Sequence, residues 1–99
     1  MPVILVNAES LSDGERASLA AVLTTTAVGL AEVQPEKVQV FFAETPDGPN
    51  TVHVLAIKHG PGADTWEAAF RHATGRRLEV RVHLYPADRT AKGGVLRTP

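Results

Sequence analysis

The chain has no cysteine and a single methionine among its 99 residues. Without cysteine it has no disulfide framework, no zinc–thiolate site and no thiol nucleophile. No apolar run approaches the roughly 20 residues that a membrane-spanning helix requires. The N-terminus also lacks the basic segment and long apolar segment of a secretory signal peptide. These absences predict a soluble, cytoplasmic protein.

Aromatic residues make up only 5% of the chain, yet 43% of its residues are hydrophobic and 21% are charged. This balance is typical of a folded globular chain and not of a disordered one. The length predicts one domain over residues 1–99. Since a chain of this size is near the lower range for a self-sufficient core, association with other chains would add useful burial.

Charge is divided unevenly between the two halves. Residues 1–50 hold two basic and seven acidic residues, whereas residues 51–99 hold eight basic and four acidic residues. One interpretation is that two solvated faces complement each other in an oligomer, and another is that the second half binds a small anionic substrate. The formal net charge of -1 argues against nucleic acid as a partner.

The first half of the chain predicts a strand, a helix and a second strand. Residues 3–6 form a short continuous apolar run, typical of a strand buried on both faces. The segment 12–15 reads Ser-Asp-Gly-Glu, a capping box that starts a helix ending near residue 31. Residues 38–43 predict the second strand. We therefore expect a first βαβ unit over residues 1–44, with Leu19, Val22 and Leu23 on the buried stripe of its helix.

The second half repeats this order. Residues 51–57 and 78–84 alternate in the manner of strands, and the helix between them has a cap signal at Asp64 and ends before Gly75. Trp66 and Phe70 fall on the predicted core face of that helix. The second βαβ unit spans residues 51–85, and residues 86–99 form a tail.

Two folds are compatible with this α/β (α+β) order of elements. In a ferredoxin-like βαββαβ sandwich the two units interleave into an antiparallel sheet. In the other fold each unit keeps a parallel pair of strands, and pseudo-two-fold symmetry relates the two units. Hydrophobic periodicity does not distinguish between them.

Pro2 is the leading candidate for a catalytic residue. If Met1 is removed, Pro2 carries a free secondary amine at the start of a buried strand; if Met1 stays, the same nitrogen is an amide with no acid–base chemistry. Burial and nearby cations lower the pKa of such an amine and tune it as a base. The structural alternative is a proline that merely begins a strand.

The opening of the chain, with Pro2 ahead of its strand, the cap at Ser12 and the second strand ending in Phe41-Phe42, resembles the tautomerase superfamily. The family includes 4-oxalocrotonate tautomerase, macrophage migration inhibitory factor and cis-3-chloroacrylic acid dehalogenase. The resemblance implies two symmetric βαβ units, a homotrimer and no cofactor. It implies an isomerase (keto–enol tautomerase) or a related dehalogenase, hydratase or decarboxylase. Pro2 would act as general base or acid on a small enol, keto acid or unsaturated carboxylate.

A cation is also needed for the carboxylate or enolate oxygen of such a substrate. The two substrate-handling arginines of 4-oxalocrotonate tautomerase would fall at Leu11 and Gln39, which carry no charge. Lys58 is the better candidate, and we expect it to occupy the place in the second unit that Pro2 occupies in the first.

The remaining candidate substrate-binding residues lie on the last strand, where Arg81, His83 and Tyr85 share one face. A metal site is not expected, because the histidine pair His53 and His83 lacks a third ligand with compelling spacing. The alternative function is a non-catalytic binding or assembly module in which Pro2 is structural.

Overall fold

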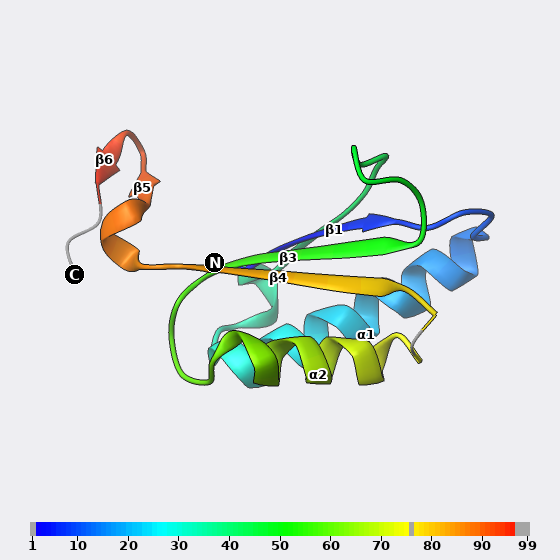
Figure 1. Cartoon of the computed structure of the whole chain (residues 1–99), viewed down its shortest axis with the longest axis horizontal. Helices are drawn as coiled ribbons and strands as arrows, with labels where there is room; N and C mark the ends of the chain where they lie inside the picture. Colours follow the sequence, from blue (N-terminus) through cyan, green and yellow to red (C-terminus); the bar gives the residue numbers. More distant parts are fainter. Residues whose placement is uncertain (1, 76, 97–99) are drawn as a thin grey trace.

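The molecule consists of two layers, with two helices packed on one face of a four-stranded mixed sheet (Figure 1). The computed structural model describes residues 2–75 and 77–96, apart from the side chains at positions 92 and 96. In chain order the elements are β1 (Val3–Asn7), α1 (Asp13–Ala31), a 3-10 helix (Pro35–Lys37), β2 (Gln39–Phe42), β3 (Thr51–Ile57), α2 (Ala63–Ala73), β4 (Glu79–Tyr85), a second 3-10 helix (Ala87–Arg89), β5 (Ala91–Lys92) and β6 (Val95–Leu96).

The order of strands in the sheet is β2-β1-β3-β4. β1 pairs in parallel with β2, β3 pairs in parallel with β4, and the two central strands β1 and β3 are antiparallel. The predicted fold of two βαβ units, each with its own parallel strand pair, is confirmed. The ferredoxin-like alternative is wrong, because the strands of the two units do not interleave.

Matching hydrogen bonds relate the two units by a pseudo-two-fold axis. The backbone amide of Gln39 donates to the carbonyl of Pro2 at 3.1 Å, and the amide of Glu79 donates to the carbonyl of Asn50 at 2.9 Å. Asn50 therefore occupies in the second unit the place that Pro2 occupies in the first. The expectation that Lys58 would be this counterpart is wrong, since Lys58 directly follows the end of β3.

The predicted capping box of α1 is present. The amide of Glu15 donates to the Ser12 hydroxyl, and the Glu15 carboxylate accepts from the Ser12 amide, both at 3.1 Å. The cap expected at Asp64 is wrong: the N-cap lies two residues earlier at Gly62, which has no side chain to cap the helix. The end of α2 is as predicted, with Gly75 in the left-handed region at a φ of 67°.

The core lies between the sheet and the two helices. Strand alternation turns the even-numbered side chains of β1, β3 and β4 toward the helices, and Trp66 and Phe70 of α2 are fully buried above them. Leu23 of α1 is also fully buried, but Val22, predicted beside it, is 41% exposed. This difference follows from helix length, because α1 has 19 residues and α2 has 11.

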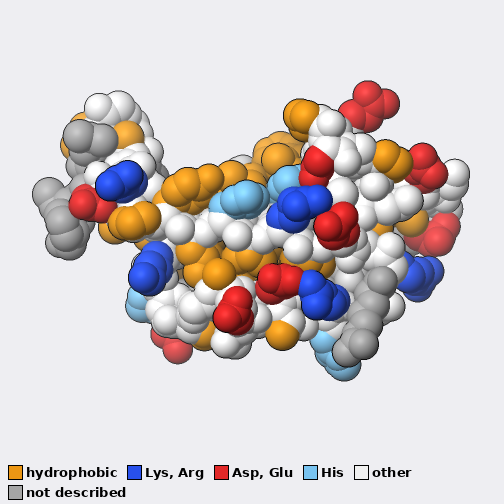
Figure 2. Space-filling model, viewed as in Figure 1, with side chains coloured by type: hydrophobic (Ala, Val, Ile, Leu, Met, Phe, Trp, Pro, Cys, Tyr) orange, Lys and Arg blue, Asp and Glu red, His pale blue; other side chains and the backbone are white. Residues whose placement is uncertain are grey.

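No described helix packs against the other face of the sheet, which we call the open face (Figure 1). Figure 2 shows histidine, arginine and carboxylate side chains gathered over the sheet, with hydrophobic side chains beside them. The strand pairings assign the following residues to this face: Val3, Leu5, Phe41, His53, Leu55, Ile57, Arg81, His83 and Tyr85.

The segment after β4 forms structure that the sequence did not predict. A 3-10 turn leads into a short antiparallel hairpin, β5–β6, which projects away from the two layers (Figure 1). Among the described residues, no helix is long and apolar enough to cross a membrane.

Candidate functional site

Pro2 stands at the start of a central strand, with its side chain almost fully buried. Its carbonyl accepts the hydrogen bond from Gln39 of the neighbouring strand, which fixes the backbone at this point. Met1, on whose removal the amine depends, lies outside the described residues. The structure thus gives the proline ring a fixed place at one end of the sheet.

Lys58 lies at the same end of the sheet as Pro2. The pairing of β1 with β3 runs from Val3 opposite Leu55, so Pro2 lies opposite Ala56, and Lys58 is two residues farther along. At about 3.3 Å per residue, its Cα is about 7 Å beyond that level along the strand. Its amide donates to the Tyr85 carbonyl at 2.7 Å, and its side chain is exposed. Of the two predicted cations, Lys58 and Arg81, Lys58 is therefore the one nearer to Pro2 in register.

The side chains of Arg81 and His83 stand elsewhere, on the open face. Arg81 pairs with His53, and this pair is three residues along the sheet from the level of Pro2. Arg81 itself lies on β4, two strands across from β1. Each of these offsets amounts to about 10 Å. The ring of Pro2 points to the helix side, so one chain by itself does not bring Arg81 and Pro2 into a common pocket.

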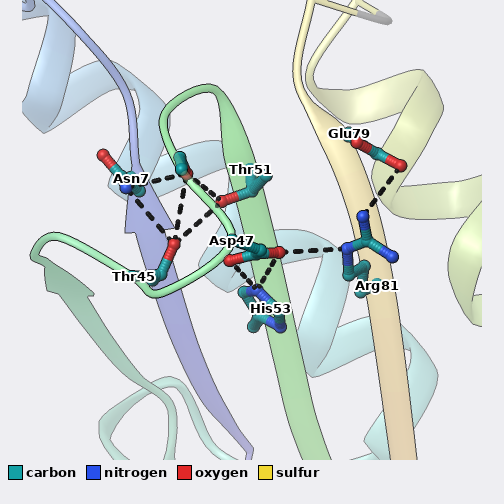
Figure 3. A network of polar contacts seen from close by, with 8 residues as sticks. Asn7, Thr45, Asp47, Thr51, His53, Glu79 and Arg81 are labelled. Carbon is teal, nitrogen blue, oxygen red and sulfur yellow. Dashed lines mark hydrogen bonds and ion pairs between the residues drawn. The ribbon is translucent and has the colours of Figure 1, made fainter.

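A polar cluster on the open face surrounds Asp47, which lies in the loop between β2 and β3. The Asp47 carboxylate is 2.9 Å and 3.0 Å from Nε2 of His53, and its Oδ2 accepts a hydrogen bond from Nε of Arg81 at 3.1 Å (Figure 3). Arg81 also donates from Nη2 to Glu79 at 3.1 Å. The cluster thus ties the β2–β3 loop to two strands of the second unit.

The same loop is held to the first unit by a second set of polar contacts. Nδ2 of Asn7 donates to the Gly48 carbonyl at 2.8 Å and to the Thr45 hydroxyl at 3.2 Å. The buried Thr51 hydroxyl donates to the same carbonyl at 3.1 Å (Figure 3). The β2–β3 loop is therefore held over the open face by side-chain hydrogen bonds from both β1 and β3.

These contacts change the acidity of Asp47. The hydrogen bond with His53, followed by one with Thr45, lowers the pKa of Asp47 from 3.8 to about 2. The cluster borders a hollow of about 520 Å³ whose lining includes Leu5 and Leu55. Arg81, His83 and Tyr85 also line this hollow, so the three predicted binding residues of β4 share one surface.

The His53 and His83 rings stack, with their centroids 5.7 Å apart and their planes inclined by 8°. They are diagonal neighbours on the adjacent strands β3 and β4, since His83 pairs with Leu55 and His53 pairs with Arg81. Among residues 2–75 and 77–96, no three histidine, aspartate or glutamate side chains group as metal ligands.

Comparison with known proteins shows which fold this is. No family model and no curated protein matches the chain. Native fused 4-OT matches 96% of the chain and 94% of its own length, at 18% identity and a TM-score of 0.68. A fused 4-OT solved as an asymmetric trimer has the same coverage, with 17% identity and a TM-score of 0.62. A member of the cis-3-chloroacrylic acid dehalogenase family matches 98% of the chain and 82% of its own length, with 20% identity and a TM-score of 0.56.

The chain has the tautomerase-like fold. The predicted resemblance to the tautomerase superfamily is confirmed at the level of fold, since these structures cover nearly the whole chain.

Sequence reasoning missed the role of Asp47. The segment around it reads Thr-Pro-Asp-Gly-Pro, a composition typical of a turn and of nothing more specific. An acidic residue in a turn that precedes a strand carrying His53 is a weak signal for such a contact. Its partner Arg81 lies 34 residues away, and only the pairing of β3 with β4 brings the two together.

Proposed function

We propose that the chain is an enzyme of the tautomerase type, in which removal of Met1 frees the amine of Pro2 for acid–base catalysis. The observation that carries this proposal is the position of Pro2, whose ring is buried at the start of a central strand and whose carbonyl is hydrogen-bonded to Gln39. A buried, fixed amine is poorly solvated in its protonated form, so burial lowers its pKa toward the working range of a base.

The reaction that suits such an amine is proton transfer in a small enol, α-keto acid or unsaturated carboxylate. The neutral amine takes a proton from a carbon next to the carbonyl, which leaves an enolate and a protonated proline. The proline then returns the proton at another atom of the same substrate, so no proton is gained or lost overall. An amine that stays protonated acts instead as the acid of a hydration or dehalogenation.

Lys58 is the proposed partner of Pro2. An exposed ammonium at the same end of the sheet suits the substrate carboxylate or the developing enolate oxygen. Lysine interacts as a point charge without the two-pronged geometry of arginine, so it places little constraint on substrate shape. Arg81, His83 and Tyr85 are proposed to bind substrate only if another copy of the chain brings their open face near Pro2.

We propose that the chain assembles as a homotrimer. The open face offers apolar side chains with no described element packed on them, among them Phe41 at 49% exposure and Tyr85 at 43%. The β5–β6 hairpin projects from the body and is available to reach a neighbour. The fused 4-OT structures solved as asymmetric trimers support this proposal.

The test begins with the intact mass of the protein purified from its native host. We expect a mass lower by one methionine, and turnover of a phenylpyruvate-type enol that Pro2→Ala reduces by at least a hundredfold, in line with the loss of a general base. Pro49→Ala, in the exposed β2–β3 loop, is the matched control and keeps full activity. Retained Met1, or equal rates for wild type and Pro2→Ala, would refute the Pro2 mechanism.

The alternative function is a non-catalytic assembly module, and the exposed apolar side chains of the open face are the one observation that favours it. It predicts oligomers with no turnover and a Pro2→Ala variant that differs from wild type in stability only.

A further inference from the structure

A second cavity, of about 750 Å³, lies at the end of the sheet opposite Pro2. Leu19 and Val22 of α1 and Leu78, which precedes β4, supply apolar walls. Glu15 and Arg77 supply charge of both signs. Its volume is within the range of about 300–1,000 Å³ that is typical of small-molecule sites.

The unequal helices explain why this cavity exists. The Leu30 carbonyl, near the end of α1, lies 3.6 Å from where a Cβ of Gly60 would stand, so the end of α1 adjoins the loop that leads into α2. Since α2 is eight residues shorter than α1, it ends before it reaches the first half of α1 (Figure 1). Val22 is left 41% exposed, with the cavity beside it.

The pseudo-two-fold axis relates this cavity to the end of the sheet where Pro2 lies. It is lined by Asn50, the counterpart of Pro2, and by Ala8 and Glu9, which follow β1 as Lys58 follows β3. The cavity therefore corresponds in the second unit to the Pro2 end of the first. At this end of the sheet Asn50 stands where the other end has Pro2, and the Glu9 carboxylate lies near the position that corresponds to Lys58.

The side chains around the cavity carry charges of both signs. The pKa of Glu15 is lowered, first by its hydrogen bonds with Ser12 and least by the positive charge of Arg77, and both Glu15 and Arg77 line the cavity. Oε1 of Glu15 accepts from the Ser12 amide, and Oε2 makes no hydrogen bond with the residues that the structure describes. Glu9 adds a second exposed carboxylate.

We propose that this cavity binds a small zwitterion with an apolar side chain, of the amino-acid class. The ligand carboxylate pairs with Arg77, its ammonium group pairs with Glu15 or Glu9, and its alkyl or aryl side chain covers Leu19 and Val22. A ligand of this class uses both charge signs and the apolar wall together. This site lies at the opposite end of the sheet from Pro2, and binding there does not depend on whether Pro2 is catalytic.

The experiment is a titration of the full chain with L-leucine, followed by calorimetry and by amide shifts in NMR. We expect saturable binding, with the largest shifts at residues 8–22 and 73–78. Two analogues test the zwitterion requirement: 4-methylpentanoate lacks the ammonium group and 3-methylbutylamine lacks the carboxylate. Each should bind at least tenfold more weakly than L-leucine. Equal binding of either analogue, or no binding of L-leucine, would overturn the proposal.

Matched variants locate the site. Arg77→Gln should weaken L-leucine binding about tenfold, whereas Arg71→Gln, on the outer surface of α2, should not. Val22→Asp should abolish binding, whereas Ala21→Asp, exposed on α1 but outside the cavity, should not. Circular dichroism checks that all four variants are folded. Binding that survives Arg77→Gln and Val22→Asp in folded protein contradicts this location.

Discussion

Asn50 and Pro2 are structural counterparts, because each accepts through its carbonyl the hydrogen bond from the first residue of the parallel strand that follows in its unit. Their backbones differ in one respect that decides which residue each position tolerates. Asn50 has a φ of 63°, in the left-handed region, whereas the ring of a proline holds φ near -65°. The second unit therefore cannot carry a proline here without a change of backbone.

The backbone of Asn50 leads to the first prediction. Asparagine tolerates the left-handed region better than other residues with a Cβ, and a β-branched residue tolerates it worst. We expect Asn50→Val to lower the free energy of unfolding by about 1–2 kcal/mol and Asn50→Gly to leave it within about 0.5 kcal/mol of wild type. Urea denaturation followed by circular dichroism measures both. A Val variant as stable as the Gly variant would show that φ at this position is not what matters.

The second prediction concerns the stability of the Asp47 contacts in acid. The pKa of Asp47 is about 2 in the folded chain, below its ordinary value of 3.8. Because the folded value is the lower one, the stabilisation is fully present above pH 3.8 and is lost as the pH falls toward 2. Wild type should therefore lose more thermal stability between pH 4 and pH 2 than Asp47→Asn, which has no carboxylate to protonate.

Thermal unfolding at a series of pH values measures this difference. Asp88→Asn is the control, since Asp88 is an exposed aspartate in the second 3-10 helix with no ion pair among the described residues. It should follow the wild-type pH dependence. If Asp47→Asn shows the same pH dependence as wild type, the contacts of Asp47 with His53 and Arg81 contribute nothing to stability in solution.

How much the sequence could predict depended on the range of the interactions involved. The alternation of residues 52–57 predicted the buried face of β3, and the Ser12 capping box predicted the start of α1, because both patterns are local. The parallel pairing of β1 with β2 is not local, and only the resemblance to a known family favoured it. The Asp47 cluster depends on a loop that folds back onto strands of the other unit, which no periodicity encodes.

Val22 shows that the apolar pattern of a helix does not by itself determine which residues are buried. Its spacing from Leu19 and Leu23 was that of a buried stripe, yet 41% of its surface is exposed. The pattern records which side of α1 is apolar, whereas burial depends on how far α2 extends over that side. Helix length was predicted for each unit separately, and the cavity results from the difference between the two.

The third prediction concerns Trp66, the only tryptophan of the chain. Its Nε1 is buried and has no hydrogen-bond partner among the described residues, although the ring stacks on Phe70 at a centroid distance of 6.2 Å. A buried donor without a hydrogen-bond partner lowers the stability of the fold by about 1–3 kcal/mol. Trp66→Phe removes this donor, but the smaller phenylalanine ring loses part of the packing of the tryptophan. We expect Trp66→Phe to cost less than about 1.5 kcal/mol and Trp66→Ala to cost about 3–5 kcal/mol.

Chemical denaturation followed by circular dichroism measures both Trp66 variants, because the substitution removes the tryptophan fluorescence. Phe70→Ala is the matched control for the loss of a buried ring without a polar atom. A Trp66→Phe variant as unstable as Trp66→Ala would mean that Nε1 has a partner, such as an ordered water, that the phenylalanine cannot replace.

The last prediction concerns assembly through the open face. Phe41 of β2 is 49% exposed there, and an aspartate in its place would put a charge against the apolar surface of a neighbouring copy. We expect wild type to elute as a trimer at micromolar concentration and Phe41→Asp to shift toward monomer, with its circular dichroism spectrum unchanged. Ala68→Asp, exposed on α2 in the other layer, is the control and should remain trimeric. A wild-type monomer would contradict the proposed assembly, and a trimeric Phe41→Asp would place the interface elsewhere, at the strand edges or the β5–β6 hairpin.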